Sequence, residues 1–219
     1  MKTAPITVEY INHLGSDLDV VNAARVSFDK ESDWEPDKLL SEKDAKLIDY
    51  LAKHKHWSPF SHCYLKFRIK APIFVARQLQ KHTVGLAWNE VSRRYVDSEP
   101  EFYYPDFWRY RADNIKQGSA GIHPNFMFGE VNLAAISMCL EAYNHMLKEK
   151  IAPEQARMIL PQNTMTDWVW SGSLAAFARV VKLRTDPHSQ YETSLVAHGI
   201  KYHLDNLFPV STKALLAYD

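Results

Sequence analysis

Two hydrophobic periodicities alternate along this chain, and together they most strongly restrict what it can fold into. Apolar and polar residues alternate from Leu65 to Lys70 and again from Thr164 to Trp170, which indicates strands with one wet face. A 3/4 spacing of apolar residues marks a long amphipathic helix, through Leu133, Ile136, Leu140, Tyr143 and Leu147. These patterns predict an α+β fold in which helices dominate and strands are few.

Shorter signals complete the expected order of elements. A strand is expected over residues 6–14 and a short helix over residues 17–26. Ser41-Glu42-Lys43-Asp44 resembles a capping box, so a helix should begin there and end near His54. Further helices are expected over residues 73–80, 153–160, 174–183 and 189–207. Residues 83–88, around Gly85, are expected to form a loop or irregular element, and the aromatic-rich residues 97–128 a surface excursion or lid.

Charge and composition argue against several classes of protein. Lys+Arg and Asp+Glu both total 26, whereas a protein bound to duplex DNA usually carries a basic excess, so no nucleic-acid partner is expected. The two cysteines, Cys63 and Cys139, form no CxxC motif and fit a reducing, cytoplasmic location. We expect no signal peptide, because the N-terminal residues lack an apolar h-region, and no membrane segment, because no run of 18 apolar residues occurs. His54, His56 and His62 match no zinc spacing, so no metal is expected.

The segment from Arg77 to Tyr95, RQLQKHTVGLAWNEVSRRY, carries a high density of polar groups beside a glycine-containing loop. Guanidinium groups grip phosphate bidentately. Amide side chains can read both the donor and the acceptor edges of a pyrimidine, and an ionised Glu can accept from a sugar hydroxyl or a ring N–H. The combination suits a nucleoside monophosphate. The residue types alone leave open a second interpretation, in which these polar groups are simply solvated.

Several blocks of the chain resemble the flavin-dependent thymidylate synthase family, in family-like order and spacing from Asn22 to Glu192. The family signature RQW-x-RHR…NE-x-S-x-RY is matched at Arg77-Gln78, Lys81-His82, Asn89-Glu90, Ser92 and Arg94-Tyr95. Four other blocks resemble the family's AARVSF, H-x-T/S-PF, ARxxLP and LR-x-D-x-HAQ-x-E motifs, at residues 23–28, 56–60, 156–161 and 183–192.

The resemblance implies a single α+β domain over residues 1–219, with a small antiparallel sheet and several long helices. It also implies that the protein methylates dUMP to dTMP. Methylenetetrahydrofolate would supply the carbon, NADPH would reduce the bound FAD, and reduced FAD would supply the hydride. The family is homotetrameric, with each site built from several subunits. It needs no cysteine nucleophile, so Cys63 and Cys139 are expected to be packing residues.

The resemblance also assigns roles residue by residue. Arg184 would be the catalytic residue, because a cation beside the pyrimidine stabilises the deprotonated ring or the enolate; a helix-end cation or an ion pair with Asp186 is the alternative. The nucleotide would be bound by Gln78, Lys81, Glu90, Val91, Ser92, Arg93, Arg94, Arg157 and Arg184. The flavin would lie near Ser27, Ser58, Lys81, His82, Thr83, Glu90 and Arg179. Ser92 is expected to form hydrogen bonds rather than act as a nucleophile, since no base partner is evident.

The chain departs from the family mainly where the flavin is expected. Lys81 and Thr83 replace the outer arginines of Arg-His-Arg, and one extra residue precedes Asn89. Lys81 keeps the charge but loses bidentate geometry, while Thr83 loses the charge, which Arg179 could replace from another element. Two alternatives therefore stay open. One is a flavin- and folate-dependent pyrimidine nucleotide hydroxymethylase, and the other is a nucleotide-binding relative without flavin catalysis.

Overall fold

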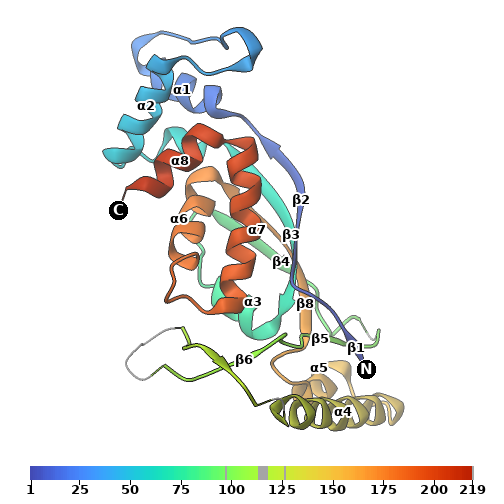
Figure 1. Cartoon of the computed structure of the whole chain (residues 1–219). Coiled ribbons are helices and arrows are strands. Elements are labelled where there is room, and N and C mark those ends of the chain that lie inside the picture. Colours follow the sequence, from blue (N-terminus) through green and yellow to red (C-terminus); the bar gives the residue numbers. More distant parts are fainter. Residues whose placement is uncertain (97, 113–117, 126, 219) are drawn as a thin grey trace.

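A computed structural model describes residues 1–96, 98–112, 118–125 and 127–218 of the chain (Figure 1). Its central feature is a four-stranded antiparallel sheet in the order β2-β3-β8-β4. The strands are β2 (Thr7–Leu14), β3 (Tyr64–Pro72), β8 (Met165–Ser173) and β4 (Leu86–Glu90). The α+β class and the small antiparallel sheet are thus confirmed.

The strand β4 corrects the expectation of an irregular element over residues 83–88. Gly85 has a φ of +76°, which glycine adopts without strain, and its carbonyl accepts a hydrogen bond from the Ser173 amide. From Leu86 onward the chain runs along β8, with Trp88 opposite Trp170. Pairing with a neighbouring strand, rather than local sequence pattern, therefore defines this edge strand.

One face of the sheet is covered by helices (Figure 1). The alternation along β3 buries Leu65, Phe67, Ile69 and Ala71 on that face. Phe67 meets Phe177 of α6 edge to face, with 5.1 Å between ring centroids. The main core is completed by helices α1 (Asp17–Arg25), α2 (Glu42–Lys53), α3 (Ile73–Leu79), α6 (Leu174–Arg184), α7 (Tyr191–Leu207) and α8 (Pro209–Ala217).

Helix α8 is an element that the sequence analysis did not predict. Its first turn is capped from α1: the Asp17 carboxylate accepts hydrogen bonds from the backbone amides of Val210 and Ser211, at 2.9 Å each. A carboxylate at this position satisfies free amide groups and opposes the positive end of the helix dipole. The residue that caps the start of this helix thus lies 193 positions before it in the sequence.

A second, smaller core lies at the opposite end of the molecule from α1 and α2 (Figure 1). It forms between α4 (Met127–Lys148), α5 (Pro153–Ala156) and the 3-10 turn η4 (Arg157–Ile159). The predicted stripe of α4 is confirmed at Ile136, Leu140 and Tyr143, which are buried. The helix expected from Pro153 ends early, at Ala156, and η4 continues it.

The expected surface excursion contains short strand pairs in its described parts. Strand β5 (Glu101–Phe102) pairs in parallel with β1 (Lys2–Thr3), and β6 (Trp108–Arg109) pairs with β7 (Ile122–His123). Residues 97, 113–117 and 126 of this segment lie outside the described residues. No helix in the described part of the chain is long and apolar enough to cross a bilayer.

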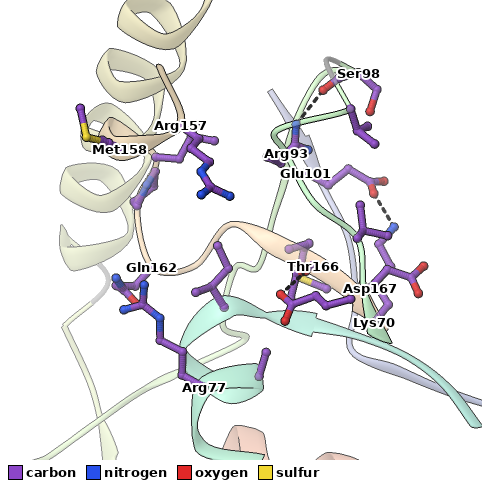
Figure 2. A pocket seen from close by; sticks show the side chains of 18 of the residues that line it. Lys70, Arg77, Arg93, Ser98, Glu101, Arg157, Met158, Gln162, Thr166 and Asp167 are labelled. Carbon is purple, nitrogen blue, oxygen red and sulfur yellow. Dashed lines mark hydrogen bonds and ion pairs between the residues drawn. The ribbon is translucent and has the colours of Figure 1, made fainter. Parts of the chain in front are cut away.

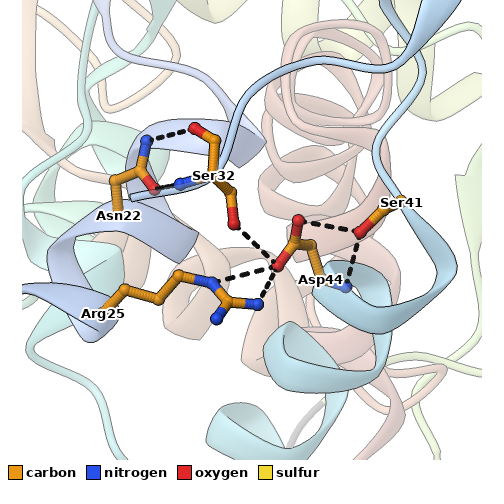
Figure 3. Close-up of polar contacts among 5 residues, drawn as sticks. All are labelled: Asn22, Arg25, Ser32, Ser41 and Asp44. Carbon is orange, nitrogen blue, oxygen red and sulfur yellow. Dashed lines mark hydrogen bonds and ion pairs between the residues drawn. The ribbon is translucent and has the colours of Figure 1, made fainter. Parts of the chain in front are cut away.

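A buried carboxylate joins α1 to α2 (Figure 3). As predicted, Ser41 caps α2: its hydroxyl accepts from the Asp44 amide at 3.1 Å and donates to the Asp44 carboxylate at 2.8 Å. The same carboxylate accepts from Arg25 Nε and Ser32 Oγ, both at 3.1 Å. Burial alone would raise the pKa of Asp44, but these hydrogen bonds hold it below its usual value. The network fixes the end of α1.

Three more 3-10 turns connect these elements: η1 (Val26–Phe28), η2 (Pro36–Lys38) and η3 (Pro59–Ser61). η1 follows α1 directly, so the Arg25–Asp44 contact also positions the segment that carries Ser27. η3 lies against α1 and α6 and leads into β3.

Candidate active site

A cavity of about 800 Å³ opens between α3, η4, the start of β8 and the chain that leaves β4 (Figure 2). Four of the residues predicted to bind the nucleotide line it, namely Glu90, Val91, Arg93 and Arg157. They come from two segments more than sixty residues apart in the sequence, which the fold places on facing walls. The cavity is large enough for a nucleoside monophosphate.

The residues at the end of β4 are held by neighbouring groups. Glu90 accepts a hydrogen bond from Thr166 Oγ1 at 2.7 Å and one from Trp88 Nε1 at 3.1 Å. The Val91 amide donates to the Asp167 carbonyl at 2.8 Å, and Arg93 donates to the Ser98 carbonyl at 2.9 Å. These contacts fix the direction of the segment and leave acceptor capacity on the Glu90 carboxylate.

Ser92 and Arg94 are not among the residues that line this cavity. The Ser92 hydroxyl accepts from the backbone amide and from Nε of Arg94, at 3.3 Å each. The Arg94 guanidinium lies 4.9 Å from the centre of the Tyr95 ring. In the described residues, the Ser92 hydroxyl is thus engaged with the following arginine.

A second group of predicted residues gathers at the end of α6. Arg184 Nε donates a hydrogen bond to His82 Nε2 at 3.0 Å, so that ring nitrogen is unprotonated. Burial lowers the pKa of His82, and the positive charges of Arg184 and Arg179 lower it further. Burial also lowers the pKa of Arg184. The result is a partly desolvated cation beside a neutral imidazole.

The alternative ion pair between Arg184 and Asp186 is absent from the described residues. Asp186 instead accepts from the His188 backbone amide at 2.7 Å and contacts His188 Nδ1 at 3.0 Å. The Asp186 carboxylate is thereby engaged within its own loop. Arg184 keeps its charge without a carboxylate partner in the described part of the chain.

Arg179 reaches the turn that carries Thr83. Its Nη2 donates to the Val84 carbonyl at 2.8 Å, one residue beyond the position where the family has its second outer arginine. Thr83 and Lys81 are exposed on the same turn. The Arg179 guanidinium of α6 thus lies close to Thr83, the position at which the family has an arginine.

Like Ser92 and Arg94, three more of the predicted residues do not line the cavity. Gln78 lies on α3, where its side chain accepts from Thr193 Oγ1 of α7. Ser27 in η1 and Ser58 before η3 are exposed, and both turns contact α1. Helix α1 lies at the end of the molecule away from α4 and α5 (Figure 1). Large exposed apolar side chains flank both serines: Val26 and Phe28 on either side of Ser27, and Trp57 before Ser58.

Sequence analysis missed two features near these groups. Arg77 lines the nucleotide-sized cavity, although it received no role; the only signal was its place in the matched Arg77-Gln78 pair. Arg109 of β6 forms a bidentate ion pair with Glu192 of α7, at 2.8 and 2.9 Å. No local pattern connects Arg109 with Glu192, which lies 83 positions later in the sequence. Burial and the same Glu192 carboxylate also raise the pKa of the nearby Tyr103 to about 12.

Comparisons with known proteins agree with the resemblance. A family model described as "Thymidylate synthase complementing protein" matches residues 9–210. The flavin-dependent thymidylate synthase of Pseudothermotoga lettingae is 32% identical over 216 residues, which cover 96% of this chain and 90% of the relative. The enzyme of the same name from Thermus thermophilus is 37% identical over 211 residues, covering 94% of this chain and 74% of the relative.

A solved structure is similar over the full length of the fold. It is described as a UMP/dUMP methylase, PolB from Streptomyces cacaoi, bound with 5-Br dUMP. The TM-score is 0.88 at 30% sequence identity, with 100% of this chain and 98% of the other covered. A second structure of that protein, bound with 5-Br UMP, gives a TM-score of 0.84.

Proposed function

This chain belongs to the flavin-dependent thymidylate synthase family, and we propose on that basis that it methylates dUMP to dTMP. The observation that carries the proposal is the cavity that gathers Glu90, Val91, Arg93 and Arg157 from separate motifs of the family. In this proposal Arg157 binds the phosphate, and Glu90 accepts from the sugar or the ring. Gln78, Lys81, Ser92 and Arg94 complete the nucleotide contacts.

Arg184 would activate the pyrimidine. Its guanidinium cannot lose its proton in the working pH range, and partial burial strengthens its effect on a nearby negative charge. The neutral His82 ring holds Arg184 by a hydrogen bond without neutralising it. The fixed cation then favours the deprotonated ring or the enolate that makes C5 nucleophilic.

The residues expected near the flavin suit a dinucleotide such as FAD. The Lys81 ammonium and the Arg179 guanidinium lie on the 81–85 turn or in contact with it, and such cations bind a diphosphate. The exposed Phe28 and Trp57 beside Ser27 and Ser58 offer apolar surface for a ring. Reduced FAD, when bound, supplies the hydride that completes the methyl group. We assign FAD contacts to Ser27, Ser58, Lys81, His82, Thr83, Glu90 and Arg179.

Methylenetetrahydrofolate and NADPH are the proposed co-substrates, and a homotetramer is the proposed assembly. Support for shared sites comes from the fold: Ser27 lies in η1 and Ser58 precedes η3, and both turns contact α1. Helix α1 lies at the opposite end of the molecule from α5, which η4 with the cavity residue Arg157 follows directly (Figure 1). Exposed apolar residues on α4, including Met127, Val131 and Met138, offer a surface for a second copy. A monomer in light scattering would contradict the assembly. We also propose a cytoplasmic location, since Cys63 and Cys139 are free thiols.

The test is the visible absorbance spectrum of the purified protein, followed by titration with dUMP. A bound flavin whose spectrum changes on addition of dUMP supports the proposal. A colourless protein that still binds dUMP would instead identify a nucleotide-binding relative without flavin catalysis. Because the similar solved structure is described as a UMP/dUMP methylase, UMP is titrated in parallel to measure selectivity for the deoxyribose.

A further inference from the structure

The proposed nucleotide cavity contains a cation to which the family resemblance gives no role, Arg77. Its side chain projects from α3 and is exposed. Arg77 Nη1 donates to Gln162 Oε1 at 3.4 Å, a long contact with a neutral acceptor. Among the described residues Arg77 has no carboxylate partner, so its charge is uncompensated.

Four of the other eight charged residues that line the cavity already form ion pairs. Lys70 forms an ion pair with Glu101. Asp167 pairs with Arg68 at 3.0 Å, and Glu99 lies 3.4 Å from the Lys2 ammonium. These groups therefore contribute little net charge to the cavity.

Arg93 also has no carboxylate partner among the described residues, but it lies on the opposite side of the cavity from Arg77 (Figure 2). Arg157 is the second such guanidinium on the Arg77 side. It projects from η4, and no carboxylate of the described chain lies in ion-pair contact with it; Glu154, which lines the same region, pairs with neither arginine. Figure 2 shows Arg77, Gln162 and Arg157 on one side of the cavity, and Lys70, Arg93, Glu101 and Asp167 on the other. The cavity thus has a cationic end formed from two different elements.

We propose that Arg77 binds the 5′-phosphate of the nucleotide together with Arg157. The inference rests on the proposed function for the identity of the nucleotide. A phosphate monoester carries close to two negative charges at neutral pH. Two guanidinium groups from separate elements match both that charge and the several acceptor oxygens. Arg77 would thus be a substrate-binding residue that selects a nucleoside monophosphate over a nucleoside.

The test compares the binding of dUMP and of deoxyuridine, which lacks the phosphate, by calorimetry. Deoxyuridine is used at millimolar concentration so that weak binding is also measured. Arg77→Gln should weaken the binding of dUMP on the order of 10- to 100-fold, because it removes a charge-assisted contact, and should leave deoxyuridine binding unchanged. Arg77→Lys should fall in between, because lysine keeps the charge but loses the fork. Lys46→Gln, which removes one positive charge on α2, is the matched control and should bind as wild type does.

Three results would overturn the proposal in distinguishable ways. If wild type binds dUMP and Arg77→Gln binds it equally well, Arg77 does not contact the phosphate. If Arg77→Gln weakens dUMP and deoxyuridine by the same factor, its effect is structural. If wild type does not bind dUMP, the proposed function fails and this inference fails with it. Thermal unfolding checks that the variants are folded, and Arg77→Lys supplies the comparison if Arg77→Gln is not.

Discussion

Replacing Asp44 with asparagine should destabilise the protein by about 3 kcal/mol. The Asp44 side chain is 4% exposed and its partner Arg25 is 15% exposed. Removing one member of a buried ion pair costs about 3–5 kcal/mol, because the other charge stays buried without compensation. Asparagine keeps one acceptor oxygen for Arg25 or Ser41, so the expected loss of stability lies at the lower end of this 3–5 kcal/mol range, at about 3 kcal/mol. For a chain of this size, the unfolding midpoint should fall by roughly 6–12 °C.

The destabilisation should depend on pH in a defined direction. The pKa of Asp44 is lowered in the folded protein, so its carboxylate stabilises the fold at pH values above the pKa of the unfolded chain, about 4. That contribution is lost as the pH falls through the lower, folded-state pKa. The difference between wild type and Asp44→Asn should therefore be full at neutral pH and shrink under acidic conditions.

Thermal unfolding followed by circular dichroism, at one protein concentration, measures both effects. Asp205→Asn is the control, because it removes a carboxylate from an exposed ion pair with Lys201 and should change stability by less than about 1 kcal/mol. If the midpoint of Asp44→Asn matched that of Asp205→Asn at neutral pH, the reasoning from burial would be refuted.

Three further predictions concern the residues around the site. Arg184→Ala should lower kcat by at least about 100-fold with an unchanged unfolding midpoint, and normal turnover would exclude its assigned role. Glu192→Gln should cost roughly 3 kcal/mol in chemical denaturation, because Arg109 loses its partner, and an unchanged denaturation midpoint would count against that estimate. The pKa of His82 is lowered in the folded protein, so just below pH 6.5 the unfolded state binds more protons than the folded state. The free energy of unfolding should therefore decrease as the pH falls through this range. An equal decrease in a His82→Gln variant would rule out His82 as the cause.

Elements with strong local signals were predictable from the sequence. The alternation in β3 and β8, the apolar stripe of α4 and the Ser41 cap of α2 each depend on residues within a few positions of one another. For such elements the packing follows the pattern, and the structure confirmed them to within a few residues.

Elements that depend on distant partners were not predictable. β4 is a short edge strand whose Trp88 stacks on Trp168 of β8, with 4.3 Å between ring centroids. α8 begins under a cap from Asp17, 193 positions before Val210. Neither contact leaves a local pattern in the sequence, so residues 83–88 were expected to be irregular and α8 was not expected.

The same limit applies to the site. The family resemblance identified Glu90, Arg157 and Arg184 by their motifs, but motif order does not indicate which residues share a cavity. The structure places Arg184 against His82 and leaves Glu90 and Arg157 in the cavity. The role proposed for Arg77 depends on the pairing of the charges around it, which only three-dimensional contacts reveal.

We propose that this chain methylates dUMP with the help of a flavin. The most direct test is the mass of the nucleotide that the purified protein forms from dUMP with methylenetetrahydrofolate and NADPH. We predict dTMP, a net gain of one CH₂ group, formed only when FAD is bound. A hydroxymethyl nucleotide, or unchanged dUMP from protein that carries its flavin, would contradict the claim.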